Sequence, residues 1–508
     1  MTEAMTAPAP ISPCAPQPLT KCRTGVPGLD DVLNGGLPEG RTTLVTGGPG
    51  CGKSVFGLQF IYSGAISGEP GIYFSFEERP DNIRANAMTF GWNLSALEER
   101  GLAAVVDGRL DAAEILSGSL KSAGVLGRLE KLATELDVKR VVIDGADVLS
   151  RLFDNVLSEC SELYYLHERL MARGITTILT AKLTSDQYST ARYEFLDFMA
   201  DCVITLDQRV RDQVSVRHLR VVKYRGSGFG RHEYPCVIDE RGLNLFPITA
   251  LNLKERTPGA LVSTGHSDLD TLLRGGYRRG SSLLISGFTG AGKTTVAASL
   301  AEAAARRGER VLYASFEESP AELTTAMLSA GIDLGTLVEA GCLRIESAYP
   351  EAMTIEHHLL RLSKRLQAFQ PALLVIDSIS VLERLGPNQL AIGFVVRLLA
   401  LCKHRGVTCI LTHERPGMGE SIASFRYNLA AMMDIIMLLR YIPEDGEIRR
   451  EFHIAKAHGS DHSHRVHQFS ISARGIEFPT IIDERDVDEV NRSNREWLER
   501  SGALRPSI

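Results

Sequence analysis

Short apolar runs, rich in β-branched residues, alternate along this chain with longer stretches that have helical spacing. Three such runs stand out in each half, at 72–76, 140–144, 176–180, 311–316, 372–377 and 407–412. Each run ends in or beside polar residues. This alternation predicts an α/β fold in which a mostly parallel sheet is covered by helices. Ligands bind such sheets at the carboxyl ends of the strands, so the polar residues there are the first candidates for chemistry.

The pattern changes late in each half, where two apolar runs follow each other with no helical stretch between them. The runs are 203–206 and 214–223 in the first half, and 435–439 and 449–456 in the second. We expect these runs to form neighbouring strands at one end of each sheet.

The two halves repeat each other. The segment 24–36 returns as 264–276, and Lys53 and Lys293 lie 293 − 53 = 240 positions apart. The Ser-Phe-Glu-Glu turn at 75–78 returns at 315–318 with the same offset of 240. A chain of 508 residues is long enough for two or three domains. We therefore predict a disordered arm, a first domain, a linker, a second domain and a charged tail, with bounds 1–18, 19–249, 250–260, 261–475 and 476–508.

Each half contains a phosphate-loop motif, in which Gly and four free positions precede Gly-Lys-Ser or Gly-Lys-Thr. An apolar run precedes each motif and a helix-like run follows it, so backbone N–H groups and a helix N-terminus converge on an anion. We expect the lysines to bind the β- and γ-phosphates and the last hydroxyl of each motif to bind Mg²⁺. The predicted nucleotide-binding residues are Gly48, Pro49, Gly50, Cys51, Gly52, Lys53 and Ser54, and Thr289, Gly290, Ala291, Gly292, Lys293 and Thr294.

Carboxylates follow the strands of both halves. Asp144 and Asp377 each end an apolar run, where a carboxylate of the metal's second shell is needed. An Asp at this place is also an ordinary helix cap, but the upstream phosphate loops favour the metal role for both residues, together with Ser54 and Thr294.

Paired glutamates follow another strand of each half. Adjacent carboxylates beside a triphosphate can orient and deprotonate an attacking water or hydroxyl, while the alternative is an acidic turn at a helix start. We interpret all four as catalytic, and count Glu317 among the candidate metal ligands as well; they are Glu77, Glu78, Glu317 and Glu318.

Basic residues at the end of a late strand are further candidates. Lys223 and Arg225 share one strand face, so both could reach the γ-phosphate of a neighbouring subunit, with Arg225 as an arginine finger. The matching place in the second half has Lys456 and, instead of arginine, His458. Further histidines follow, of which His462 and His464 would share a strand face, but apart from Asp461 no cysteine or carboxylate cluster completes a tetrahedral zinc site with them.

Composition and charge limit the binding partners and the cellular compartment that we expect for this chain. The net charge of −6 gives no overall bias toward nucleic acid, and no apolar run is long enough to span a bilayer. The start has neither the charge nor the apolar centre of a secretory signal. Nine scattered cysteines are best explained by free thiols in a reducing cytoplasm. Cys51 could be sensitive to oxidation, but filling a small-residue position in the loop is the simpler interpretation.

At these motifs the chain resembles the KaiC family, the double-domain RecA-like ATPases of the cyanobacterial circadian clock and their bacterial relatives. Besides the tandem loops and Phe-Glu-Glu turns, the resemblance rests on the segments 90–92, 223–226 and 242–247. It implies two tandem RecA-like P-loop NTPase domains in a two-tiered homohexamer, with ATP and Mg²⁺ between subunits. It also implies a slow ATPase in the first domain and autophosphorylation in the second. The further nucleotide contacts that it implies are Thr89, Lys223, Tyr224, Arg225, Arg450, Lys456, Ser460 and His462.

The chain departs from the family pattern in its second half. Ala430 and Ala431 stand where the family has adjacent Ser and Thr phosphoacceptors, and an earlier threonine acceptor falls at Phe425. Ser421 and Ser424 are the substitutes that the sequence offers. Ala330 replaces an aromatic residue near the nucleotide, which puts the activity of the second domain in question.

Two other functions stay open. The first is a nucleotide-gated scaffold, in which a signalling partner docks on the ring face or on the C-terminal tail around residues 496–498. The second is a RecA-related recombinase or helicase, against which the lack of a strongly basic segment argues.

Overall fold

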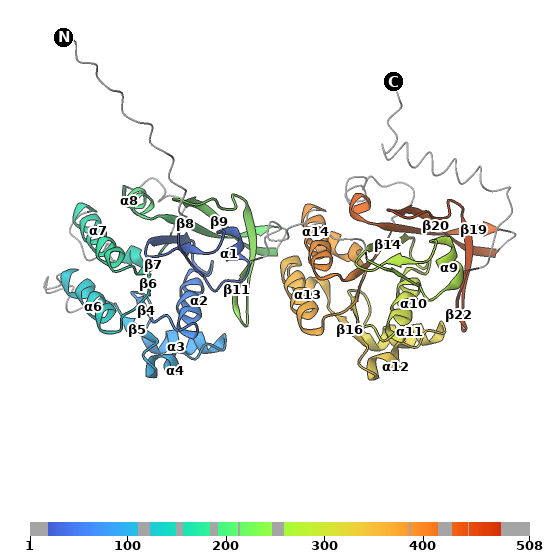
Figure 1. The fold of residues 1–508 in the computed structure, drawn as a ribbon, viewed down its shortest axis with the longest axis horizontal. Helices are drawn as coiled ribbons and strands as arrows, with labels where there is room; N and C mark the ends of the chain where they lie inside the picture. Colours follow the sequence, from blue (N-terminus) through green and yellow to red (C-terminus); the bar gives the residue numbers. More distant parts are fainter. Residues whose placement is uncertain are drawn as a thin grey trace, which may run out of the picture. The chain divides into compact units, whose positions relative to one another are not determined.

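The computed structural model describes residues 19–109, 122–148, 156–182, 191–211, 214–245, 259–385, 388–414, 429–444 and 447–478. Two compact units make up the chain, and a nine-stranded sheet lies at the centre of each (Figure 1). The predicted α/β class, with two tandem RecA-like domains, is confirmed.

The strands of the first sheet lie in the order β11-β10-β9-β8-β3-β7-β6-β4-β5. A two-stranded ribbon, β1 (Lys21–Cys22) with β2 (Leu37–Pro38), lies outside it. The sheet strands are β3 (Thr42–Gly47), β4 (Gly71–Ser75), β5 (Ala103–Asp107), β6 (Arg140–Asp144), β7 (Thr176–Lys182), β8 (Cys202–Arg211), β9 (Val214–Tyr224), β10 (Glu233–Asp239) and β11 (Gly242–Leu245). The helices are α1 (Leu29–Val32), α2 (Lys53–Ile66), α3 (Pro80–Thr89), α4 (Leu94–Glu99), α6 (Ser122–Glu135), α7 (Val156–Ala172) and α8 (Ala191–Met199).

Side-chain alternation along the buried strands builds two cores. Val45 and Val142 pack on the face covered by α2, in a cluster that also contains Phe56 and Trp92. Their neighbours Leu44 and Val141 point to the opposite face, which α6 and α7 cover. Because both faces are apolar, the strands read as continuous hydrophobic runs, as parallel strands do.

The second sheet has the same strand order, β16-β15-β17-β18-β14-β19-β20-β21-β22, when it is read from the other edge. The ribbon β12 (Leu261–Val262) with β13 (Tyr277–Arg278) again lies outside it. The strands are β14 (Ser282–Gly287), β15 (Val311–Ser315), β16 (Leu343–Ser347), β17 (Leu373–Asp377), β18 (Thr408–Glu414), β19 (Ile435–Glu444), β20 (Glu447–Ala457), β21 (His467–Ser472) and β22 (Gly475–Glu477). The helices are α9 (Ser267–Leu272), α10 (Lys293–Arg306), α11 (Pro320–Ser329), α12 (Leu334–Glu339), α13 (Ile355–Phe369) and α14 (Asn388–Arg405), with 3₁₀ turns at η3 (Pro350–Ala352) and η4 (Ile379–Leu385).

Parallel registry aligns the strand ends that carry the candidate residues. Ser75 at the end of β4 pairs with Asp144 at the end of β6, and Gly47 at the end of β3 pairs with Lys182 at the end of β7. The second sheet pairs Ser315 with Asp377 in the same way. The polar ends of the predicted strands therefore meet along one edge of each sheet.

The neighbouring late strands are present as predicted, β8 beside β9 and β19 beside β20. The second pair is antiparallel over its whole length and has one irregularity, at Ile436/Met437. In each unit the first strand of this pair lies parallel to the phosphate-loop strand, β8 beside β3 and β19 beside β14.

Some predictions fall outside the described residues: the arm at 1–18, residues 250–258 of the linker and residues 479–508 of the tail. The bounds of the domains and of the linker stay predictions. Among the residues that the structure describes, no helix is both long and apolar enough to cross a membrane.

Candidate nucleotide-binding sites

Two glycines fix the shape of the first phosphate loop. A Cβ atom on Gly47 would lie 2.2 Å from the carbonyl oxygen of Leu206, and one on Gly52 would lie 2.7 Å from Cδ1 of Ile238. Gly52 is also the N-cap of α2, with a left-handed φ of 104° that favours glycine. Close packing against the backbone of β8 thus requires glycine at position 47, and the left-handed backbone favours glycine at position 52.

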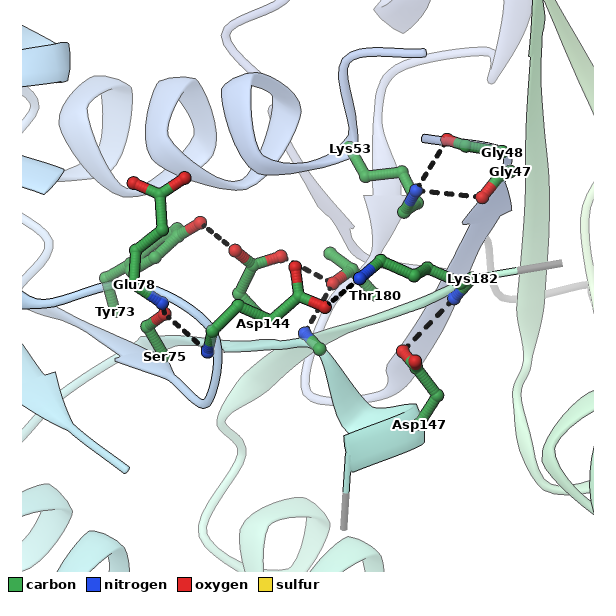
Figure 2. Close-up of polar contacts among 12 residues, drawn as sticks. Gly47, Gly48, Lys53, Tyr73, Ser75, Glu78, Asp144, Asp147, Thr180 and Lys182 are labelled. Carbon is green, nitrogen blue, oxygen red and sulfur yellow. Dashed lines mark hydrogen bonds and ion pairs between the residues drawn. The ribbon is translucent and has the colours of Figure 1, made fainter. Parts of the chain in front are cut away.

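Lys53 lies inside this loop (Figure 2). Its Nζ donates hydrogen bonds of 2.8 Å to the carbonyl oxygens of Gly47 and Gly48. Burial lowers the pKa of Lys53, and the charges of Asp144 and Asp147 oppose that shift. A cation held by two loop carbonyls, next to a helix N-terminus, is suited to take up phosphate oxygens.

Cavities open on both sides of the loop. One of about 270 Å³ is lined by residues that include Ser54, Tyr73, Glu78, Thr89, Phe90 and Asp144. A second, of about 620 Å³, lies toward β8 and β9, with Gly47, Gly48, Asp207 and His218 in its lining. The predicted residues Ser54, Thr89, Glu78 and Asp144 therefore share one cavity beside the loop.

Asp144 is buried and its orientation is fixed by two hydroxyl groups (Figure 2). The Tyr73 hydroxyl donates to Oδ2 at 2.7 Å and the Thr180 hydroxyl donates to Oδ1 at 2.6 Å. Burial and the charge of Asp144 raise the pKa of Tyr73 well above its usual range, so the phenol stays a donor. With one donor on each oxygen, Asp144 is suited to hold a metal-bound water rather than the metal itself.

The paired glutamates of the first half have different partners. The Ser75 hydroxyl oxygen accepts hydrogen bonds from both backbone N–H groups, at 3.3 Å from Glu77 and 3.1 Å from Glu78. The side chain of Glu77 forms an ion pair with Lys182, and Glu78 accepts a 3.0 Å hydrogen bond from Asn86 Nδ2. The turn thus sends one carboxylate toward the loop side and the other toward α3.

The second half repeats this arrangement. Lys293 Nζ donates to the Phe288 carbonyl oxygen at 2.9 Å, and Tyr313 donates to Asp377 Oδ2 at 2.7 Å. Thr412 donates to the other oxygen of Asp377. The hydroxyl of Ser378, next in the chain, donates to Glu317 at 3.0 Å.

Glu318 differs from its counterpart in the first half. Its Oε2 is buried and has no hydrogen-bond partner among the described residues. Burial raises the pKa of Glu318, and the charges of Asp377 and Glu317 raise it further. A carboxylate with an unsatisfied oxygen and a raised pKa suits a group that accepts a proton or a water's hydrogen bond.

These residues fit Mg²⁺ bound together with a nucleotide. Each site offers a hydroxyl at the start of its helix, Ser54 or Thr294, and a fixed carboxylate, Asp144 or Asp377. No group of three or more His, Cys, Asp or Glu that could hold a metal by itself occurs in the described part of the chain. A cation that keeps waters and shares phosphate ligands is the better match.

Arg225 lies at the sheet edge opposite its own phosphate loop. Its N–H donates to the Asp201 carbonyl at 2.8 Å, and the N–H of Asp201 donates to the carbonyl of Thr42, the first residue of β3. The loop leaves from the last residue of β3, about 17 Å away at about 3.3 Å per residue. Arg225 therefore has no access to the nucleotide of its own domain.

Lys223 lies at the same end of the sheet as Arg225. The two side chains share one strand face, as predicted. Lys223 Nζ and Arg225 Nη2 both donate to the carbonyl oxygen of Phe198, at 3.4 and 2.8 Å. Tyr224 between them points inward, is buried, and donates a 2.8 Å hydrogen bond to the Gly36 carbonyl. Its side chain serves the fold of its own domain.

The corresponding second-half residues are arranged alike. Lys456 Nζ donates to the carbonyl oxygens of Ala430 and Ala431, at 3.1 and 3.3 Å. The Ser460 hydroxyl donates to the Leu273 carbonyl at 3.5 Å, and the rings of His462 and His464 lie 4.5 Å apart. Ser421, Ser424 and Phe425 lie outside the described residues.

Arg450 is an exception, because it lies on the loop side of its own domain. Its guanidinium group stacks 5.6 Å from the centre of the Tyr441 ring, and Tyr441 donates to the Gly290 carbonyl of the phosphate loop. Arg217 occupies the matching place in the first half, where its Nε donates to the Gly50 carbonyl at 3.3 Å. The repeat in the sequence points to Arg217. Arg450 follows Arg217 by 450 − 217 = 233 positions, which is the same offset that separates Lys456 from Lys223, 456 − 223 = 233.

Lys182 and Glu414, which end β7 and β18, were also missed. Both follow the predicted strands by two residues, and no phosphate-loop motif includes them.

Cys51 is buried, and burial raises the pKa of its thiol, which supports the small-residue interpretation of that position.

Comparison with known proteins finds similarity to one family over both halves of the chain. The profile of the family described as "ATPase: KaiC" matches residues 22–250 and 262–481. "Circadian clock protein KaiC2" of Synechocystis sp. is 35% identical over 463 residues, which cover 90% of this chain and 81% of that protein. "Circadian clock oscillator protein KaiC" of Parathermosynechococcus lividus is 33% identical over 503 residues, covering 95% of this chain and 93% of that protein. The protein of the same name from Synechococcus elongatus is 33% identical over 470 residues, covering 92% of this chain and 90% of that protein.

Proposed function

The chain belongs to the KaiC family of ATPases, and from this premise we propose that its first domain hydrolyses ATP while its second domain binds ATP and hydrolyses it weakly. The proposed enzyme is a homohexameric ring that serves circadian or related signalling. ATP and Mg²⁺ are its cofactors, and the cytoplasm is its proposed location.

In the proposed reaction, the loop residues of the first domain hold the triphosphate and Lys53 binds its terminal phosphates. Ser54 and Asp144 would hold Mg²⁺, which would supply positive charge against the phosphates. Glu77 and Glu78 orient a water and take its proton as the oxygen attacks the γ-phosphorus. The bond from the γ-phosphorus to the bridging oxygen breaks, and ADP leaves with that oxygen.

The observation that carries this proposal is the placement of Arg225. Its backbone is fixed at the edge opposite the phosphate loop, through Asp201 and Thr42. An arginine so placed can complete a nucleotide site only outside its own domain, and we propose that this site lies in the first domain of another copy of the chain. One repeated contact of this kind generates a closed ring when its rotation closes.

Three differences support a weaker second domain. Ala330 stands where the first domain has Phe90, which stacks on Trp92 at 4.8 Å. His458 replaces the arginine, and Glu414 replaces Lys182. These changes favour ATP binding with little turnover, so a nucleotide-gated scaffold for a signalling partner is the second candidate. We also assign the proposed protein kinase activity to this second domain. It would act on other hydroxyls, because Ala430 and Ala431 have none.

The test compares phosphate release by wild type, Lys53→Ala, Lys293→Ala and the double change Glu77→Gln with Glu78→Gln. We expect the double change to slow release at least about a hundredfold, because general-base help is lost. Loss in Lys53→Ala alone would assign turnover to the first domain. Unchanged release in the glutamine variant would contradict the role of that pair.

Phosphosite mapping by mass spectrometry on the same samples tests the kinase proposal. Phosphate on a second-domain hydroxyl that disappears in Lys293→Ala would establish an autokinase. An unmodified protein that still binds ATP at the second site would favour the scaffold.

A further inference from the structure

The two nucleotide sites carry opposite charges at one equivalent position. Lys182, the last residue of β7, pairs in register with Gly47, where the first phosphate loop begins. Glu414, the last residue of β18, pairs in register with Gly287, where the second loop begins. The strand order of the two sheets is the same, so both residues lie beside the start of their own loop.

The backbone contacts confirm that the positions correspond. The N–H of Lys182 donates to Oδ1 of Asp147 at 3.2 Å (Figure 2). The N–H of Glu414 donates to Oγ of Ser380 at 2.6 Å. Asp147 and Ser380 each lie three residues after the strand-end aspartate of their half, because 147 − 144 and 380 − 377 both equal 3.

The side chains act on different groups. Lys182 forms its ion pair with Glu77, one of the two carboxylates proposed to handle the attacking water. Glu414 accepts a hydrogen bond from the hydroxyl of Thr289, inside the second phosphate loop. Burial lowers the pKa of Lys293, and the charges of Glu414, Asp377 and Glu317 oppose it in that order. Glu414 is thus directed at the place where phosphates bind.

The difference changes the charge that a nucleotide meets. Asp147 and Lys182 together carry −1 + 1 = 0, whereas Ser380 and Glu414 carry 0 − 1 = −1. A nucleotide without magnesium brings its full negative charge to each loop, and a carboxylate beside the loop repels it at short range. A lysine at the same place attracts it.

We propose that the residue at this strand end sets the magnesium requirement of each site: Lys182 lets the first site bind nucleotide without the metal, and Glu414 makes the second site depend on it. Lys182 supplies a second cation beside Lys53, and releases Glu77 when it turns to the terminal phosphate. Among the described residues, Glu414 then leaves Lys293 as the lysine of a loop near the carboxylates of Glu414, Asp377 and Glu317. This inference rests on the proposed binding of ATP at both sites.

The test measures binding of a fluorescent ATP analogue to the full chain, with excess Mg²⁺ and again with EDTA. Lys293→Ala isolates the first site and Lys53→Ala isolates the second. The ratio of the dissociation constants without and with Mg²⁺ should be about tenfold higher at the second site. Lys182→Glu should raise the first-site ratio about tenfold, and Glu414→Lys should lower the second-site ratio by the same factor.

Matched controls are available on the exposed surface of each domain. Lys131→Glu on α6 and Glu339→Lys on α12 make the same charge changes away from the loops and should leave both ratios unchanged. Lys182→Gln and Glu414→Gln, which remove charge without inverting it, should move each ratio about threefold in the same directions and decide the matter if an inverted variant fails to fold.

The outcomes separate the two proposals. No binding of the analogue at either site of the wild type would overturn the proposed function. Binding at both sites with ratios that the four strand-end variants leave unchanged would overturn this inference alone.

Discussion

Asp144 and Asp377 show how much order one buried carboxylate imposes on its surroundings. Each accepts a tyrosine and a threonine hydroxyl, from Tyr73 and Thr180 or from Tyr313 and Thr412. The sequence places both aspartates at strand ends but gives no sign of their hydroxyl partners. Those partners come from neighbouring strands far away in the chain, and only the register of the sheet brings them together.

Tyr73→Phe should destabilise the first domain by about 1–3 kcal/mol, because a buried oxygen of Asp144 loses its donor while the ring still fills its space. Urea unfolding without nucleotide measures the change. Tyr313→Phe is the matched variant in the second domain, and we expect a loss of similar size. A variant as stable as wild type would contradict the assigned hydrogen bond.

Other residues near the loop carry no local signal in the sequence, and only the repeat offset of 233 points to one of them, Arg217. The motif identified Lys53 and Lys293 because the phosphate loop uses a fixed local spacing. Lys182 and Arg217 reach the same loop from other strands, across 182 − 53 = 129 and 217 − 53 = 164 positions. Their contacts depend on tertiary structure, and a single sequence carries no local signal for them.

Elements were predicted well where both faces of a strand are buried. The segment 140–144 is a strand with the predicted bounds, and 72–76 and 311–316 are each within one residue of theirs. The edge strands β5 and β16 were not predicted, since Leu343–Ser347 mixes charged with apolar residues and only its first residue is buried. An edge strand needs less apolar sequence and therefore resembles a loop.

Helices α3 and α11 occupy equivalent places in the two domains, but their N-termini are capped differently. The Ser319 hydroxyl accepts from the N–H of Glu322 at 3.3 Å, and Glu322 accepts from the N–H of Ser319 at 2.9 Å, which is a complete capping box. Arg79, the N-cap of α3, makes no side-chain hydrogen bond to its helix.

Ser319→Ala should therefore lower the free energy of unfolding of the second domain by about 1 kcal/mol. Arg79→Ala is the matched control and should change the first domain much less. Thermal or urea unfolding measures both variants, and equal effects would show that the capping box contributes nothing in solution.

The whole molecule is a duplicated unit whose two copies share strand order and site layout. The repeat at offset 240 predicted this duplication, and the sheets confirm the fold class. The offset itself does not hold along the chain: it is 240 at the phosphate loops and 233 at the late strands. The difference means that the two halves differ in length between those points.

Mixed assemblies test the proposed ring directly. Lys53→Ala retains Arg225 but has a damaged loop, whereas Arg225→Ala retains its loop and lacks the arginine. Each alone should lose first-domain turnover by about a hundredfold or more. Mixing the two after disassembly should restore part of the activity, because intact loops then meet intact arginines. Phosphate release by the mixture that equals the average of its parts would contradict a shared site.

The phosphate loop and Arg225 lie at opposite ends of the strands of one sheet, and in the proposed ring this makes the ATPase activity depend on protein concentration. On the proposed arrangement, a dilute, separated chain is folded and can hold its nucleotide, yet lacks the group that speeds hydrolysis. Turnover per chain would then rise steeply with the amount of protein present. The cell could silence the enzyme by letting its abundance fall, with no inhibitor and no chemical change to the polypeptide.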